Sequence, residues 1–108
     1  MLTGYRLMWM LVMFDLPVVE ERERKAATAF RKALLNQGFE MAQFSVYLRH
    51  CTGPEQVETL TKRVQSELPE GGKVDILYFT DKQYERIASF VGKKRSDARK
   101  NPDQFSLF

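Results

Sequence analysis

One aspartate of this 108-residue sequence stands where a carboxylate could hold a metal ion. Asp15 directly follows Leu7 to Phe14, the longest uninterrupted run of apolar residues in the chain. A magnesium ion takes oxygen ligands and commonly uses only one or two carboxylates, with water completing its octahedron. Asp15 could equally begin an Asx turn before Leu16 and Pro17. The residue types therefore leave a metal site and a plain turn as alternatives.

Basic residues gather in two places where they could contact phosphates. Residues 1–91 hold 12 basic and 12 acidic residues, whereas residues 92–108 hold five basic and two acidic ones, an excess of +3. Such side chains bind a nucleic-acid backbone without reading bases, although solvated helix faces and frayed tails have the same composition. The candidate nucleic-acid contacts are Arg24, Lys25, Arg31 and Lys32 on a predicted helix face and Lys93, Lys94 and Arg95 in the C-terminal segment.

Three residues of one predicted strand are further candidates. Phe44 and Tyr47 have rings that could stack on nucleobases. Side chains alternate along residues 41–48, and this alternation predicts that Phe44 belongs to the core. Ser45 has no general base close to it in the sequence, so the pattern does not indicate a nucleophile.

The only histidine and the only cysteine are His50 and Cys51. One cysteine cannot form an internal disulfide, and this pair does not supply the four ligands of a structural zinc site. We expect both at the surface, without a catalytic role. No apolar run approaches the roughly 18 residues of a membrane span, and no signal peptide is visible. The expected location is the cytoplasm.

Hydrophobic periodicity predicts the elements that must position these residues. Strands are expected over residues 6–14, 41–48 (bent near Ser45 or Tyr47 into a short hairpin), 74–80 and 87–91, with a helical turn over 81–86. One helix is expected over residues 20–36, with Ala26, Ala27, Phe30, Ala33 and Leu34 facing inward. A second is expected between a Thr52–Glu55 capping box and Pro69, with Val57, Leu60, Val64 and Leu68 facing inward.

This order of elements predicts an α+β fold. It is a ferredoxin-like βαββαβ sheet with two helices on one face and an extra C-terminal strand. The first strand is apolar on both sides, so the sheet face without helices requires a cover, and a homodimer through that face is expected. Residues 1–91 would form the domain, and residues 92–108 a basic tail.

Several segments together resemble a known family. They are Met13-Phe14-Asp15-Leu16-Pro17, Phe30-Arg31-Lys32-Ala33-Leu34-Leu35, Gly38-Phe39, Gln43-Phe44-Ser45-Val46-Tyr47 and Thr80-Asp81-Lys82-Gln83-Tyr84. In this order they resemble the Cas-two family of small CRISPR-associated adaptation proteins, in its short form from type II systems. The resemblance covers about residues 5–92.

The resemblance implies a homodimer that acts as a magnesium-dependent endonuclease on RNA or double-stranded DNA. Asp15 corresponds to the family's metal-binding catalytic aspartate, which meets its copy across the two-fold axis. The family also bridges the larger integrase subunit and holds captured double-stranded DNA, the prespacer, during spacer acquisition. Because a single acidic residue is a small active site, the sequence favours a DNA-binding bridge between integrase subunits as the biological role, with nuclease activity at Asp15 as a competing hypothesis. Without the resemblance, the alternative is a dimeric ferredoxin-like RNA-binding or regulatory domain without catalysis.

The end of the chain is unusually apolar for a tail. Phe105, Leu107 and Phe108 follow a charged segment and form a candidate anchor. The anchor would add a strand to the partner subunit's sheet or dock on the integrase subunit, modes that use main-chain pairing or apolar pockets. A frayed terminus is the simpler alternative.

Overall fold

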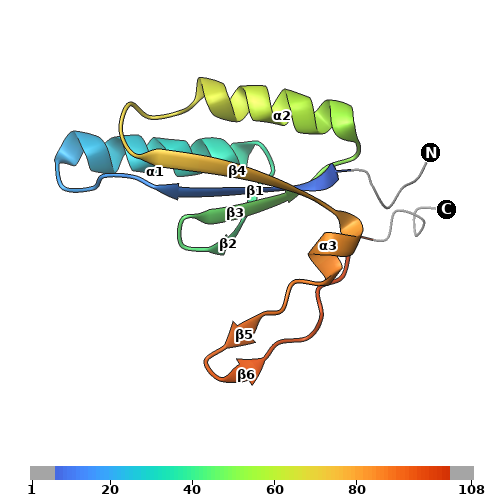
Figure 1. The fold of residues 1–108 in the computed structure, drawn as a ribbon. Coiled ribbons are helices and arrows are strands. Elements are labelled where there is room, and N and C mark those ends of the chain that lie inside the picture. Colours follow the sequence, from blue (N-terminus) through green and yellow to red (C-terminus); the bar gives the residue numbers. More distant parts are fainter. Residues whose placement is uncertain (1–6, 103–108) are drawn as a thin grey trace.

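The structure is a computed structural model that describes residues 7–102. Its elements are β1 (Leu7–Asp15), α1 (Glu21–Asn36), β2 (Glu40–Gln43), β3 (Val46–His50), α2 (Pro54–Ser66), β4 (Lys73–Thr80), α3 (Asp81–Glu85), β5 (Phe90–Val91) and β6 (Lys94–Arg95). Strands β1 to β4 form one antiparallel sheet in the order β2-β3-β1-β4. Helices α1 and α2 lie on one face of this sheet (Figure 1). The predicted ferredoxin-like α+β fold is confirmed.

Strand β1 is the centre of the core. Its side chains Met10, Val12 and Phe14 are buried beneath the two helices. The helices meet them with Ala27, Phe30 and Leu34 of α1 and Val57, Leu60 and Val64 of α2. Two residues predicted to face inward do not: Ala26 lies exposed at the margin of the α1 face, and Leu68 lies beyond the end of α2 and is exposed.

The other face of the sheet has no long helix across it. Leu11 lies opposite Leu48 of β3 and Leu77 of β4. Side chains alternate along a strand, so these three residues and Met13 point away from the helices. Met13 and Leu77 stay 40% and 39% exposed. We call this surface the open face, and it is defined by Leu11, Met13, Leu48 and Leu77.

Helix α1 begins and ends where the sequence indicates. Glu20 is the N-cap, and it forms a capping box in which its backbone N–H donates to the Glu23 carboxylate at 2.8 Å. Gly38 follows the end of the helix with φ +85°, the left-handed conformation that glycine adopts at low cost. These signals are local, so the sequence alone is sufficient to predict them.

The predicted cap of α2 is wrong. Gly53 is the N-cap residue, and it has no side chain to bond the first turn. Thr52, the predicted cap, lies one residue before the observed N-cap, and its backbone N–H donates to Gln56 Oε1 at 2.8 Å. Pro54 at the first helical position ends the extended segment and fixes this start, because proline has no N–H to leave unpaired there.

The β2–β3 hairpin reverses the predicted orientation of two aromatic residues. Gln43 pairs with Val46, so Phe44 and Ser45 form a two-residue turn. The turn interrupts the alternation, and as a result Phe44 is 91% exposed whereas Tyr47 is 3% exposed and belongs to the core. The bend expected near Ser45 is present, but the prediction that Phe44 is a core residue is wrong.

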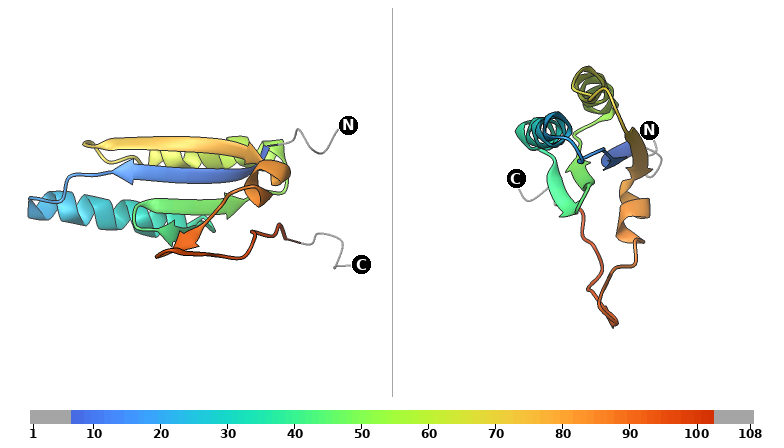
Figure 2. Two further views of the ribbon diagram at one scale, coloured as in Figure 1. Left: turned by 60° about the horizontal axis from the view of Figure 1, so that its bottom comes forward. Right: turned by 90° about the vertical axis from the view of Figure 1, so that its left-hand side faces the viewer.

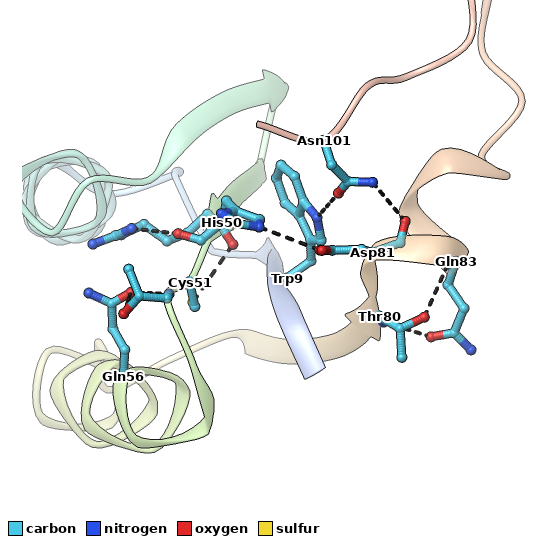
Figure 3. Close-up of polar contacts among 10 residues, drawn as sticks. Trp9, His50, Cys51, Gln56, Thr80, Asp81, Gln83 and Asn101 are labelled. Atoms are coloured by element: carbon cyan, nitrogen blue, oxygen red, sulfur yellow. Dashed lines mark hydrogen bonds and ion pairs between the residues drawn. The ribbon is translucent and has the colours of Figure 1, made fainter. Parts of the chain in front are cut away.

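The chain folds back on the open face at the Trp9 end of β1 (Figure 3). The Trp9 ring stacks on Tyr84 of α3 with centroids 3.7 Å apart, and its Nε1 donates to Asn101 Oδ1 at 2.7 Å. Asn101 Nδ2 donates in turn to the Asp81 carbonyl at 3.0 Å. His50 packs edge-on against Trp9. We call this group the Trp9 clasp. It covers one end of the open face and leaves the Asp15 end bare.

The predicted last strand is shorter than expected and pairs elsewhere. Strand β5 forms a separate two-stranded hairpin with β6 and does not join the main sheet. This hairpin, residues 90–95, extends away from the sheet on the side opposite to α1 and α2 (Figures 1 and 2). We call it the arm. The boundary expected at residue 91 falls within the arm, so that division stays a prediction.

Replacing Phe30 by alanine tests the core. Phe30 is 2% exposed and meets Phe14 edge-on at 5.2 Å, so Phe30→Ala leaves a cavity. We expect the free energy of unfolding to fall by about 3–5 kcal/mol in chemical denaturation. Leu35→Ala on the exposed side of α1 is the control, with an expected change within about 0.5 kcal/mol. Equal losses in the two variants would contradict this core.

Candidate functional site

Asp15 is the last residue of β1 and is exposed at the bare end of the open face. It lies opposite Lys73, the first residue of β4. Alternation from Met13 places the Asp15 side chain on the open side of the sheet. Among residues 7–102 no basic group lies within ion-pairing distance of its carboxylate. The Lys73 ammonium lies instead 3.8 Å from Asp75 Oδ2.

Two neighbouring loops fix the backbone around Asp15. The Phe14 N–H donates to the Ser45 carbonyl at 3.1 Å, which ties the β2–β3 turn to the end of β1. On the other side Gly72 adopts φ +84°, and a Cβ there would lie 2.5 Å from the Asp15 carbonyl oxygen. Only glycine fits such an approach without displacing the strand. The carboxylate is therefore carried on a rigid backbone although its side chain is exposed.

A single carboxylate fits only one kind of metal site. The described residues contain no group of three or more histidine, cysteine, aspartate or glutamate side chains able to hold an ion together. Magnesium differs from zinc in keeping several water ligands and using one or two carboxylates. The Asp15 carboxylate, exposed and without an ion pair among residues 7–102, could supply one protein ligand to such a hydrated ion.

The basic residues predicted on α1 are on its outer surface, away from Asp15. Arg24 Nη1 donates to the carbonyls of Val18 and Val19 at 3.2 and 2.6 Å, and Lys25 lies 3.4 Å from the Glu21 carboxylate. Arg31 donates to the Thr28 hydroxyl on the same helix, and Lys32 is exposed. Helix α1 lies on the covered face of the sheet, so one chain does not bring these four residues together with Asp15 (Figure 1).

The basic residues of the C-terminal segment are on the arm. Lys93 is in its turn after Gly92, and Lys94 and Arg95 form β6; all three are exposed. The Arg95 guanidinium lies 5.8 Å from the centre of the Phe90 ring. The arm projects from the open side of the sheet, so these cations are on the same side as Asp15 (Figure 2). The predicted anchor, Phe105, Leu107 and Phe108, lies outside the described residues.

His50 and Cys51 are not surface residues. Cys51 is fully buried in the core, and its backbone N–H donates to the Met8 carbonyl. Burial raises the pKa of the Cys51 thiol, and the nearby Arg49 guanidinium opposes part of this rise. The His50 side chain is 16% exposed, with Nε2 3.4 Å from Asp81 Oδ1 in the Trp9 clasp. Sequence patterns missed both burials because they depend on α2 and α3 folding over the end of β3.

Sequence reasoning missed Lys73 and misplaced Phe44, two exposed residues on the strands and turn that flank Asp15. Lys73 is its partner across the strands, and Phe44 is in the turn whose next residue, Ser45, bonds to Phe14. Neither could be placed without the register of β1 against β4 and the position of the β2–β3 turn. The backbone therefore places a cationic residue on one side of Asp15 and an aromatic residue on the other.

The fold and this site together define a class of protein. It is a small ferredoxin-like protein with a rigidly held, exposed carboxylate at the end of its central strand and basic residues on separate surfaces. Residues 8–87 match the family model described as "CRISPR associated protein Cas2". The chain belongs to this family, and the resemblance noted in the sequence is confirmed.

Similar proteins support the same assignment. A relative from Paracidovorax avenae is 67% identical over the full length of both chains, and one from Flavobacterium psychrophilum is 47% identical over 99% of this chain and 93% of its own. Both are named "CRISPR-associated endoribonuclease Cas2". A solved structure described as "Crystal structure of cas2" has a TM-score of 0.57 and 21% identity, over 88% of this chain and 98% of that one, and supports the fold.

The described helices can be compared with the length and hydropathy that a membrane-crossing helix requires. No helix in the described part of the chain combines the length and the hydropathy that crossing a bilayer would require.

The close approach of Gly72 to Asp15 can be tested with Gly72→Ala. The new Cβ would meet the Asp15 carbonyl oxygen and the Leu16 side chain, and alanine disfavours a positive φ. We expect the free energy of unfolding to fall by more than about 1 kcal/mol, measured by urea titration. Gly92→Ala is the matched control, because Gly92 also has a positive φ of +62° but no atom within 4 Å of a new Cβ. A smaller loss for Gly72→Ala than for Gly92→Ala would contradict the steric argument.

Proposed function

We propose that this protein is a homodimeric, Mg²⁺-dependent endoribonuclease whose reaction centre is the pair of Asp15 carboxylates. The observation that carries the proposal is the geometry of Asp15: an exposed carboxylate on a rigid strand end, with no basic partner in the described residues. The names of the relatives support the choice of RNA as substrate.

Dimerisation follows from the open face. Leu11, Leu48, Met13 and Leu77 form an apolar surface that the helices of the same chain do not cover. A second copy packed on this face by two-fold symmetry covers both surfaces at once. The proposed two-fold axis passes close to the bare Asp15 end of this surface, where it brings a second carboxylate to the site.

The chemistry of the chain is limited to a few roles. When bound, Mg²⁺ polarises a phosphate oxygen and lowers the pKa of a water ligand. Asp15 holds and orients the hydrated ion, and its rigid backbone keeps that position fixed. Lys73 is exposed beside it and provides a positive charge for the phosphate backbone.

Binding of nucleic acid uses contacts to phosphates, which give affinity without base readout and make it strongly dependent on salt. Clustered basic side chains favour two surfaces for such contacts, the outer side of α1 and the arm. The proposed contacts are Arg24, Lys25, Arg31, Lys32, Lys93, Lys94 and Arg95.

A second candidate function is favoured by the scarcity of acidic groups at the site. One carboxylate per chain is a small active site, whereas two basic surfaces per chain suit a scaffold. In this role the dimer binds double-stranded prespacer DNA and bridges copies of the larger CRISPR integrase subunit during spacer acquisition in the cytoplasm. Phe105, Leu107 and Phe108 would supply the apolar anchor for that subunit.

Asp15→Asn separates the two functions. The amide keeps the shape of the side chain but is a much poorer ligand for Mg²⁺. We expect loss of metal-stimulated cleavage of single-stranded RNA, with a melting temperature close to that of the wild type because the side chain is exposed. Glu40→Gln, an exposed carboxylate on β2, is the control and should cleave normally. Equal cleavage by the wild type and Asp15→Asn would rule out a metal site at this position.

Leu77→Lys tests the dimer. A charge in the middle of the open face opposes its burial, and Leu77 is exposed enough that the chain should still fold. We expect the wild type to sediment as a dimer and Leu77→Lys to sediment nearer to the 12.6 kDa of one chain. Leu35→Lys on the exposed side of α1 should remain dimeric. A monomeric wild type at micromolar concentration would contradict the proposal.

A further inference from the structure

Phe44 is the most exposed of the large apolar side chains in the described residues. Its exposed fraction is 91%, whereas the other two aromatic residues of its neighbourhood, Phe14 and Tyr47, are buried. The phenyl ring therefore contributes nothing to the core. An aromatic ring held in water offers both of its faces to another planar group.

The backbone that carries this ring is held in place. Phe44 belongs to a two-residue turn, and the next residue, Ser45, has φ +62°, the only positive φ of a residue other than glycine in the described part of the chain. The Ser45 carbonyl accepts the Phe14 N–H at 3.1 Å. The turn is thus attached to the end of β1, one residue before Asp15, and the ring does not sit on a free loop.

Phe44, Asp15 and Lys73 form a row across the end of the sheet. The strand order β2-β3-β1-β4 puts the Phe44 turn on one side of Asp15 and Lys73 on the other. Neighbouring strands are about 5 Å apart, so the backbone of the turn that carries Phe44 lies about one strand spacing from the end of β1. The Lys73 side chain is 79% exposed and has only a long contact, 3.8 Å, to Asp75.

We propose that Phe44 is a stacking platform for an unpaired nucleobase of single-stranded RNA. Stacking on an aromatic side chain accepts any base, because every base has a π face, but it requires that the base be unpaired. Phe44 thereby selects single strands, a preference that phosphate contacts alone cannot produce. The inference rests on the proposed function only for the placement of an RNA phosphate at Asp15. The stacking itself rests on the exposure of Phe44 and on the attachment of its turn to β1.

The first experiment measures binding without cleavage. A fluorescein-labelled 12-nucleotide single-stranded RNA of mixed sequence is titrated with each variant in EDTA, by fluorescence anisotropy. We expect Phe44→Ala to weaken binding about 5- to 150-fold, the range given by stacking one base. Phe44→Tyr should stay within about twofold of the wild type, because tyrosine retains the ring.

Two controls make the effect specific. Met41→Ala removes another exposed apolar side chain from the same hairpin, and should leave RNA affinity unchanged. A 12-base-pair DNA duplex should bind the wild type and Phe44→Ala equally, because its bases are paired. Unchanged RNA affinity in Phe44→Ala, or equal losses for RNA and duplex, would overturn the proposal.

A second experiment reports stacking directly. Phe44→Trp introduces an exposed indole, whereas the native Trp9 is 7% exposed and already stacked on Tyr84. Saturating single-stranded RNA should quench the emission of the introduced indole and protect it from acrylamide. Full emission at saturation would overturn the proposal. A second pair of results would also overturn it: the indole of Phe44→Trp is shielded from acrylamide before RNA is added, and Phe44→Ala sediments differently from the wild type. Both results together would mean that a second copy of the chain covers Phe44.

The outcomes also separate this inference from the proposed function. If Asp15→Asn cleaves like the wild type while Phe44→Ala loses RNA affinity, the metal site is wrong and the stacking platform stands. If Asp15→Asn is inactive while Phe44→Ala binds RNA like the wild type, the metal site stands and the stacking platform is wrong.

Discussion

Strand β1 needs cover on both of its faces, and the helices of one chain supply cover for only one. Met10, Val12 and Phe14 are buried beneath α1 and α2, which accounts for the sheet order and for the short loops that return each helix to the sheet. The other face, with Leu11 and Met13, is left to other elements. Removal of apolar area from water is the main driving force of folding and association, so this second face decides how the chain assembles.

Residues of the same chain cover part of this second face. The Trp9 clasp covers one end of the open face with α3 and Asn101, using ring stacking and two hydrogen bonds. The opposite end stays bare in the described residues, and it is the end that carries Asp15, Lys73 and the Phe44 turn. Exposed apolar surface and the candidate functional residues are therefore neighbours, and the proposed dimer contact and the proposed RNA site share one region of the molecule.

The sequence was sufficient where an element follows an unbroken apolar pattern, and insufficient where a turn breaks the pattern or where contacts across the fold decide the burial of a residue. The run ending at Asp15, the apolar stripe of α1 and the Gly38 cap all predict their elements. Phe44 is exposed and Tyr47 is buried, the reverse of the predicted alternation, because the two-residue turn shifts the side chains that follow it to the other face. Cys51 is buried by a helix that follows it. Asp15 was identified as a candidate from its position and from family resemblance, whereas its neighbours Lys73 and Phe44 required the strand register.

The Trp9 clasp also constrains the order in which the molecule folds. The hydrogen bond from Trp9 to Asn101 joins residues separated by 92 positions, so almost the whole described chain must be synthesised before it can form. The α1 and α2 layers close over β1 through contacts of shorter separation, and loop-closure entropy favours those first. The clasp is then the last described element to form and, with few buried groups holding it, the first to open. A nascent chain stalled before residue 101 therefore has a nearly complete sheet but lacks the two hydrogen bonds by which Asn101 joins Trp9 to the start of α3.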